Sequence, residues 1–426
     1  MTGDFNISKL TEDLFRHEAG KMVAVLTKIF GTENLDLSED VVQDTFINAI
    51  KVWALKGVPE NPSAWLFRSA KNKAIDVLRR NKFSKQIDFN DPERTLLQSE
   101  YTLSAAVEKL WRADDIQDDL LRMMFACCHP EIAEENQITL ILKTLCGFST
   151  SEIAKAFLTS EDTVSKRLYR TKNFFREKKI KPQFPNAAQL RSSTEAVLRT
   201  IYLIFNEGYN ATHTNEIIRK DLLDQAMYLC RLLAGNKNTG LPEVYAAMAL
   251  MCFHSSRIES RVNELGEIIL LAQQDRHKWN KSMIEEGNDF LNKAAFGDRV
   301  SSYHAEAAIA YEHCIAKTFE QTNWRHILSY YNLLVSMHPN AVVTLHRLSV
   351  IHKVFGPEKT VEEIEHSGYK KEWEKNYLYH GLLGDIYAET APKKSKKYYE
   401  TAYGMTKSDA EKKLLLKKMN ELVMNH

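Results

Sequence analysis

The scarcity of glycine and proline constrains this chain more than any other feature of its sequence. Only 16 Gly and 10 Pro occur in 426 residues. Because these two residues mark the tight turns between short strands, so few of them leave little room for a β-rich fold. Apolar residues recur instead at helical spacing along most of the chain. The sequence therefore predicts an all-α protein.

Composition excludes several classes of protein. Hydrophobic residues make up 44% and charged residues 27% of the chain, which is typical of a globular protein. No apolar run approaches the roughly 18–20 residues that a membrane span needs, and the N-terminus lacks the pattern of a secretory signal. The six cysteines are scattered, without zinc or disulfide spacing. We therefore expect a cytoplasmic protein with reduced thiols and no metal.

Charge is balanced overall, at +1, but it is unevenly distributed. Residues 64–85 and 161–181 are strongly basic, whereas residues 114–135 between them are acidic. Two basic segments separated by an acidic one indicate two separate contacts with a polyanion such as nucleic acid. From residue 188 onward there is no basic stripe, so this half is not expected to bind nucleic acid.

Two breaks in composition divide the chain into three helical parts. The polar stretch 85–104 shows no helical stripe, and 181–187 contains two prolines, so both are predicted to be linkers. The linkers separate predicted domains at 8–84, 105–180 and 188–426.

Two helices are predicted to carry the informative surfaces of the first domain. The buried stripe of the first helix consists of Val41, Val42, Thr45, Phe46, Ala49, Ile50 and Trp53. Its exposed side, called the acidic face below, consists of Glu39, Asp40, Gln43 and Asp44. The second helix, at about 62–81, begins with a proline that suits the first helical turn and presents basic side chains.

The second domain ends in a helix-turn-helix pattern. Gly147 is predicted to close one helix, and Ser149 with Glu152 has the spacing of a capping box that starts the next. A short helix, a break at 158–160 and a basic helix follow. This unit typically lays its second helix into the major groove of DNA.

Three strings in this part of the chain resemble the extracytoplasmic-function (ECF) sigma factors of bacterial RNA polymerase. SEDVVQDTFINAIKVW resembles region 2.2, NPSAWLFRSAKNKAIDVLRR resembles regions 2.3–2.4, and STSEIAKAFLTSEDTVSKRLYRTK resembles region 4. The later strings LRMMFACCHPEIA, LIFNEGY and LLAQQDRHKW are similar to those of a subclass with a long helical C-terminal extension.

The resemblance implies partners and roles for particular residues. The acidic face would dock on the clamp coiled coil of core RNA polymerase by pairing with its basic side chains. The melted minus-ten element would be held by Asn61, Trp65, Arg68, Lys71, Asn72, Arg79 and Arg80. Trp65 is equally compatible with a core position. The minus-thirty-five element would be read by Thr163, Ser165, Lys166, Arg167, Tyr169, Arg170 and Lys172. Ser165 stands where many relatives carry Arg, so this helix does not reveal the promoter sequence.

The extension offers weaker patterns. Leu383, Gly384, Tyr387, Tyr399 and Ala402 resemble a tetratricopeptide helix pair, and 326–354 resembles another, although a generic helical bundle is also compatible. Two polar strings could together line a pocket for a ligand or a protein, formed by Asn206, Glu207, Tyr209, Asp275, Arg276 and Trp279. Alternatively, these residues form helix caps and ion pairs within the chain. Cys127, Cys128 and His129 are predicted to be structural, since adjacent cysteines rarely chelate one ion.

The leading hypothesis is a promoter-specificity subunit that binds core polymerase and both duplex and melted promoter DNA, with the extension modulating its activity. The alternative is a one-component helix-turn-helix regulator with a ligand-sensing or protein-binding helical domain. The acidic face and the single-strand surface distinguish the two, because a simple duplex binder needs neither. No catalytic motif occurs, so we expect neither an enzyme nor a cofactor.

Overall fold

The computed structural model confirms the all-α fold for the residues that it describes. These are residues 2–81, 107, 111, 116–157, 159–181, 186–210, 218–263, 267–406 and 408–424. Within them the regular elements are helices, and the only β-type pairing is an isolated bridge between Val262 and Ile268. None of the described helices is long and apolar enough to cross a membrane. The predicted linker 85–104, residues 182–185 of the second linker, and Leu158 lie outside the described residues.

The chain divides into two compact units. The first unit comprises Met1–Gly208 and Lys220–Thr239, and the second comprises Tyr209–Arg219 and Gly240–His426. The start of the predicted C-terminal module thus belongs to the first unit. The boundaries of the three domains stay predictions.

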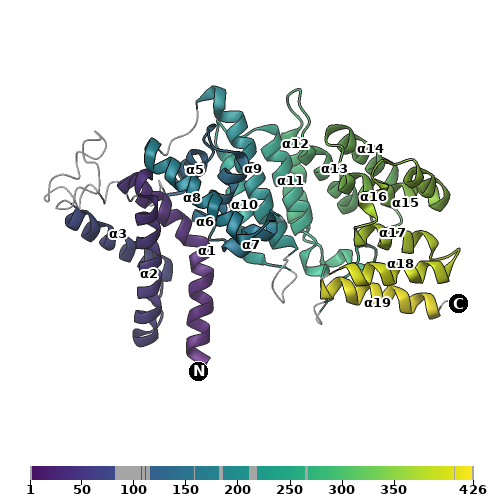
Figure 1. Ribbon diagram of the computed structural model, residues 1–426, viewed down its shortest axis with the longest axis horizontal. Helices are drawn as coiled ribbons and strands as arrows, with labels where there is room; N and C mark the ends of the chain where they lie inside the picture. The colour runs from purple at the N-terminus through teal and green to yellow at the C-terminus, as the bar shows by residue number, and fades with distance from the viewer. Residues whose placement is uncertain are drawn as a thin grey trace. The chain divides into compact units, whose positions relative to one another are not determined.

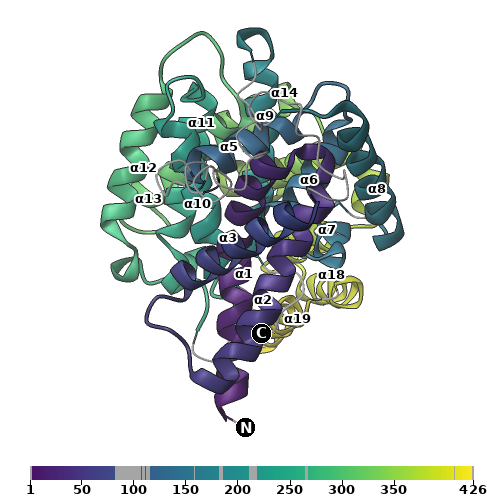
Figure 2. The ribbon, with the colours of Figure 1, turned by 90° about the vertical axis from the view of Figure 1, so that its left-hand side faces the viewer.

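Three helices begin the first unit: α1 (Thr2–Phe30), α2 (Leu35–Lys56) and α3 (Pro62–Asn81). Helices α1 and α2 lie side by side (Figures 1 and 2), joined by a short 3₁₀ turn at Thr32–Asn34. Helix α2 buries the apolar stripe predicted for it, except that Ile50 is 44% exposed. The prediction was wrong for Ile50 because this residue lies about 100° around the helix from buried Ala49, at the edge of the stripe.

The helix-turn-helix is confirmed in the next part of the unit, which contains α5 (Ile116–Cys127), α6 (Glu134–Thr144), α7 (Thr150–Ala156) and α8 (Glu161–Lys178). Gly147 follows α6 with a φ of 70°, in the left-handed region that favours glycine. The predicted capping box forms at the start of α7. The Ser149 amide donates to Glu152 at 2.7 Å, and the Glu152 amide donates to the Ser149 hydroxyl at 3.1 Å.

Two helices of the predicted extension complete the first unit: α9 (Ala187–Tyr209), except its last residue, and α10 (Lys220–Gly235). Helix α9 approaches α10 closely at Gly208, where a Cβ atom would lie 2.9 Å from the backbone nitrogen of Leu223. Helix α10 also packs on α5. The apolar side of α10 is therefore covered within the first unit.

The second unit begins with α11 (Pro242–Ser255), followed by α12 (Lys281–Ala294) and α13 (Ser302–Ile315). Helix α11 is apolar on nearly every side, which is typical of a helix surrounded by others, and ten of its residues are buried. Helix α12 packs on it through Gly287, where a Cβ atom would lie 2.7 Å from the Phe253 ring. Short 3₁₀ turns at Ile258–Ser260, Leu271–Gln273 and Arg276–Lys278 connect α11 to α12.

The rest of the second unit consists of α14 (Trp324–Met337), α15 (Ala341–Glu365), α16 (Lys370–Trp373), α17 (Tyr377–Tyr387), α18 (Pro392–Met405) and α19 (Asp409–Met424). The two predicted helix pairs exist, as α14 with α15 and α17 with α18, and α19 packs on α18 (Figure 1). Gly384 lets α17 approach α18, because a Cβ atom there would lie 2.3 Å from the Tyr399 ring. The tetratricopeptide identity of these pairs stays a prediction.

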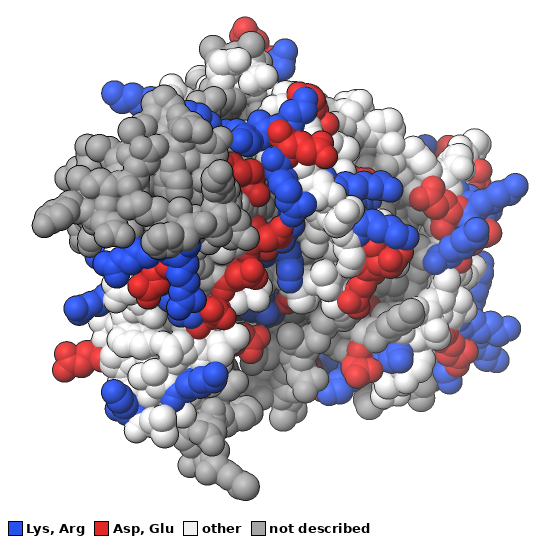
Figure 3. Space-filling model, turned by 60° about the vertical axis from the view of Figure 1, so that its left-hand side comes forward, with Lys and Arg blue, Asp and Glu red and all other residues white. Residues whose placement is uncertain are grey.

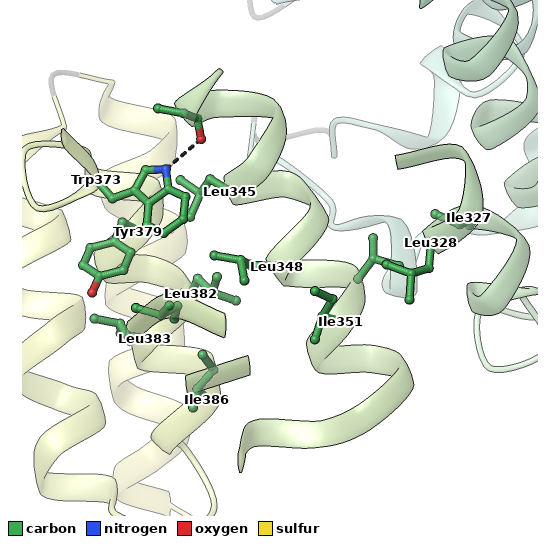
Figure 4. Packing of buried hydrophobic residues seen from close by; sticks show 13 residues of the cluster. Ile327, Leu328, Leu345, Leu348, Ile351, Trp373, Tyr379, Leu382, Leu383 and Ile386 are labelled. Carbon is green, nitrogen blue, oxygen red and sulfur yellow. Dashed lines mark hydrogen bonds between the residues drawn. The ribbon is translucent and has the colours of Figure 1, made fainter. Parts of the chain in front are cut away.

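A continuous apolar core joins these helix pairs (Figure 4). Leu345 and Leu348 of α15 face Leu382 and Ile386 of α17, and buried Trp373 lies beside them. The Trp373 indole donates a hydrogen bond of 2.7 Å to the Ala341 carbonyl at the start of α15. Helix α15 bends at Gly356, whose φ of 82° is accessible to glycine.

Candidate functional site

The acidic face of α2 is exposed at three of its four residues. Asp40, Gln43 and Asp44 are exposed, and Asp44 makes an ion pair of 3.1 Å with Lys73 of α3. Glu39 is half-buried, because it points toward the helix-turn-helix. It accepts hydrogen bonds from the Thr144 hydroxyl at 2.8 Å and from the Lys172 ammonium at 2.5 Å.

An ion-pair cluster connects α2 with α8, and the sequence patterns did not reveal it. The Lys172 ammonium lies 2.8 Å from the Asp36 carboxylate and 2.5 Å from the Glu39 carboxylate, and Arg176 lies 2.8 Å from Asp36. Burial raises the pKa of Asp36, but Lys172 and Arg176 outweigh it, so this pKa lies below its usual value. Burial lowers the pKa of Lys172, but Glu39 and Asp36 outweigh it and leave the pKa raised.

Helix α1 and the turn after it also pack tightly against the part of the chain that contains the helix-turn-helix. A Cβ atom on Gly20 of α1 would lie 1.9 Å from the Leu145 carbonyl oxygen just after α6, so only glycine fits there. The Lys28 ammonium lies 3.0 Å from the buried carboxylate of Asp119 in α5. The Thr32 hydroxyl donates to the Ile180 carbonyl. We call this whole set of contacts, together with the ion pairs of Lys172, the closed interface.

Helix α10 reaches both sides of the closed interface. The Arg16 guanidinium of α1 lies 3.9 Å from the Asp221 carboxylate of α10. The Gln225 side-chain amide donates a hydrogen bond of 3.1 Å to the backbone carbonyl of Arg16. The Lys21 ammonium lies 5.6 Å from the Tyr228 ring centroid. A cavity of about 230 Å³ lies between α10, α1, α5 and the end of α6. Its lining includes Lys21, Leu120, Leu145, Asp224, Tyr228 and Leu229.

The predicted single-strand surface on α3 is exposed at its charged residues. Arg68, Asn72, Arg79 and Arg80 are exposed, and Lys71 is half-buried. Asn61 has a structural role, because its side chain caps α3 by accepting from the Ala64 amide at 2.9 Å. Trp65 is half-buried and packs edge-on against buried Trp53 with ring centroids 5.5 Å apart. One side of the Trp65 ring thus belongs to the core.

Helix α8 divides the predicted minus-thirty-five residues between two sides. Ser165, Lys166, Tyr169 and Arg170 are exposed, and Tyr169 is 69% exposed. Thr163 is half-buried in the first turn, which Ser160 caps. The other side faces the protein: Arg167 pairs with Glu135 and lies 5.3 Å from the Phe157 ring, and Lys172 belongs to the closed interface. Figure 3 shows positive and negative side chains interleaved on the face that it draws.

The candidate pocket of the extension is only partly assembled. Tyr209, Arg276 and Trp279 lie in the second unit, close to the buried side chain of Arg257. Asp275 has a structural role, since it caps the turn Arg276–Lys278 by accepting from the His277 amide at 3.0 Å. Asn206 and Glu207 lie in the first unit, near the end of α9.

The two adjacent cysteines of the first unit lie in its core. Cys127 and Cys128 are buried, and burial raises the pKa of each thiol well above its usual value. Such burial is typical of structural cysteines. In the described part of the chain, no group of three or more His, Cys, Asp or Glu residues could hold a metal ion.

Comparison with known proteins identifies three regions of this chain. Residues 14–84 match the family model for Sigma-70 region 2, and residues 122–174 match the model for Sigma-70 region 4. Residues 193–295 match a family of unknown function, DUF6596. No solved structure matches the chain.

The chain is also similar to two whole proteins. The chain is 35% identical over 353 residues to an uncharacterized protein of Rhizobium meliloti strain 1021, covering 83% of this chain and 82% of that protein. It is 29% identical over 133 residues to the ECF RNA polymerase sigma factor SigL of Mycobacterium tuberculosis, covering 31% of this chain and 68% of SigL.

Regions 2 and 4 in one helical chain define a sigma factor, the class of protein that brings RNA polymerase to promoters. This chain belongs to the ECF sigma factors and carries a C-terminal extension that includes the DUF6596 region. It directs RNA polymerase to promoters. The match to region 2 disfavours the alternative of a one-component regulator, which needs no such region.

Proposed function

We propose that this sigma factor exists in a closed, inactive state in which regions 2 and 4 block one another's binding surfaces. The observation that carries this proposal is the ion pairing of Lys172 with Asp36 and Glu39. Glu39 belongs to the predicted polymerase dock, and Lys172 belongs to the predicted minus-thirty-five helix. While they pair with each other, neither is available to polymerase or DNA.

The spacing of promoter elements supports an opening step. Elements centred near positions −35 and −10 lie about 25 base pairs apart, which is roughly 85 Å along B-form DNA at about 3.4 Å per base pair. Helices α2 and α8 instead contact each other through ion pairs of 2.5 to 2.8 Å. A chain spans at most about 3.4 Å per residue, so the predicted linker 85–104 can extend to roughly 70 Å and let the regions separate.

We infer residue roles for the open state from exposure and charge. The exposed side chains of Asp40, Gln43 and Asp44 would dock on the clamp coiled coil of the polymerase, joined by Glu39 after opening. The melted minus-ten strand would lie along α3, against Arg68, Asn72, Arg79 and Arg80. The upstream duplex would meet the exposed side of α8. These contacts need no catalysis and no cofactor, and we infer that the protein acts in the cytoplasm beside core polymerase.

We propose that the extension modulates activity by stabilising the closed state. Helix α10 packs on α5 and also contacts α1 through Arg16 and Lys21, so it bridges the parts that must separate. The helix pairs of the second unit would provide the surface through which a regulatory protein or ligand acts. The general test is transcription from a defined promoter by purified protein with core polymerase.

Weakening the α10 bridge is expected to favour the open state. The double substitution Asp221→Ala and Gln225→Ala removes an ion pair and a hydrogen bond to Arg16, worth together about 1–2 kcal/mol. Affinity for core polymerase should rise several-fold, measured by fluorescence anisotropy. Lys237→Ala is the control, because Lys237 is exposed just beyond the end of α10 and does not line the cavity. Equal affinity of both variants would contradict a bridging role for α10.

Removing exposed cations of α8 is expected to weaken use of the upstream element. Lys166→Ala and Arg170→Ala should each lower the salt slope of duplex binding by about 0.9 if each side chain contacts one phosphate. Binding to single-stranded minus-ten DNA should not change. Lys281→Ala, at an exposed site in the second unit, is the control. An equal loss of single-strand binding would show that the two surfaces are not separate.

A further inference from the structure

The second unit contains a cluster of three arginines that form no ion pair with a described carboxylate, although exposed Glu320 acts on Arg276 from a greater distance. Arg257 is buried, with 8% of its surface exposed, and lies 5.9 Å from the ring centroid of buried Trp279. The Arg276 guanidinium lies 4.5 Å from the same centroid. Arg261 stacks at 3.6 Å from the ring centroid of Tyr209. Among the described residues, no carboxylate lies within 4.0 Å of any of these three guanidinium groups.

The bonds within this cluster leave several donors unused. Arg257 donates to the Tyr209 hydroxyl at 3.3 Å and lies 2.8 Å from Nδ1 of His254. Arg276 uses one nitrogen to cap the end of α13, at 2.6 and 2.7 Å from the carbonyls of His313 and Ala316. The Nε of Arg257, the Nη2 of Arg276 and the indole Nε1 of Trp279 are buried without a partner.

The neighbouring histidines report the positive potential of the cluster. Burial, together with the charges of Arg257 and Arg276, lowers the pKa of His313 to about 4. Burial likewise lowers the pKa of His254, with additional effects of Arg257, Arg261 and His313. Burying charged groups without counterions is costly, so such a cluster is stabilised when an anion joins it.

We propose that this cluster is a binding site for a small phosphate-bearing anion. Guanidinium groups match phosphate oxygens through charge-assisted hydrogen bonds, and phosphate carries enough oxygens to accept from two arginines and an indole together. A carboxylate has only two oxygens in one plane and suits these three donors less well. Because Arg261 and Arg276 are only half-buried, the anion would enter on their side as these side chains turn.

The site gives a chemical identity to the ligand of the extension. It lies within the second unit and uses three of the residues that the sequence nominated: Tyr209, Arg276 and Trp279. Its existence does not depend on the closed interface, because no residue of that interface takes part. Binding of the anion can therefore be measured without polymerase or DNA.

Calorimetric titration of the full-length protein tests the site directly. We expect saturable binding of inorganic phosphate or of a phosphate monoester such as glycerol phosphate, whichever carries the natural group. Arg276→Gln and Trp279→Phe should each weaken that binding about tenfold, and Arg257→Gln should abolish it. Trp279→Phe keeps an aromatic ring and removes the donor. Arg325→Gln, at an exposed position of α14, is the matched control.

Three outcomes are decisive. Binding that is lost in Arg276→Gln and Trp279→Phe, with helix content unchanged by circular dichroism, supports the proposal even if Arg257→Gln fails to fold. The absence of saturable binding, or equal binding by these variants and the control, overturns it. Much tighter binding of a phosphoserine peptide than of either small anion would also overturn it, by making a phosphorylated protein the ligand.

Discussion

Replacing Gly20 by alanine is expected to open the sigma factor and to increase its affinity for core polymerase. In the closed state the added Cβ would lie 1.9 Å from the Leu145 carbonyl oxygen, a backbone atom that cannot move alone. Such overpacking typically costs about 1–3 kcal/mol. Alanine is also favoured over glycine inside a helix by about 1 kcal/mol, but α1 is helical in both states, so this gain cancels between them. Overpacking alone should shift the equilibrium about five- to 150-fold toward the open state.

Two measurements separate opening from simple destabilisation. Small-angle scattering should show a larger radius of gyration for the variant, and anisotropy should show tighter binding to core polymerase. Gly381→Ala in α17 is the matched control, because nothing lies within 4 Å of a Cβ atom there. A lower melting temperature with an unchanged radius and no gain in affinity would contradict the closed state as an inhibited form.

Local patterns were sufficient to predict the elements that carry the site. The capping box of Ser149 and Glu152 forms as predicted, since both residues lie within one turn of helix. The acidic face follows from the period of 3.6 residues, which places Asp40, Gln43 and Asp44 opposite the buried stripe. These predictions succeed because each depends on residues that are close in sequence.

The closed interface could not be predicted in this way. Lys172 and Asp36 are separated by 136 positions, and an ion pair between distant residues leaves no pattern along the chain. The sequence does contain one signal, Gly20, because a glycine inside a helical segment often marks a place where another part of the chain packs closely against the helix. The sequence does not reveal that the approaching atom belongs to Leu145.

The arginine cluster falls between these two cases. The strings containing Tyr209, Arg276 and Trp279 were recognisable, and the structure brings these three side chains near Arg257. Arg257 lies outside both strings and carries no local signal of its burial. Asp275 belongs to one of the strings but caps a turn, which is the structural role that short polar side chains often have.

Reversing the charge of Asp40 and Asp44 together is expected to abolish binding to core polymerase. Both side chains are exposed on the acidic face, so the substitutions Asp40→Lys and Asp44→Lys should leave the helix content unchanged. Each change would replace the proposed attraction to the clamp coiled coil with a repulsion. Affinity should fall more than about a hundredfold, or about 2.8 kcal/mol, in an anisotropy titration at fixed salt.

A control with the same change of charge distinguishes a specific dock from general electrostatics. Glu285→Lys with Asp289→Lys has the same i, i+4 spacing on an exposed side of α12 in the second unit. If long-range charge dominated, both double variants would lose affinity similarly, and the loss would disappear at high salt. If the acidic face is the dock, the α12 variant binds normally, while the α2 variant stays defective after Gly20→Ala has opened the molecule. Restoration of binding by Gly20→Ala would instead mean that the two reversals act by stabilising the closed state.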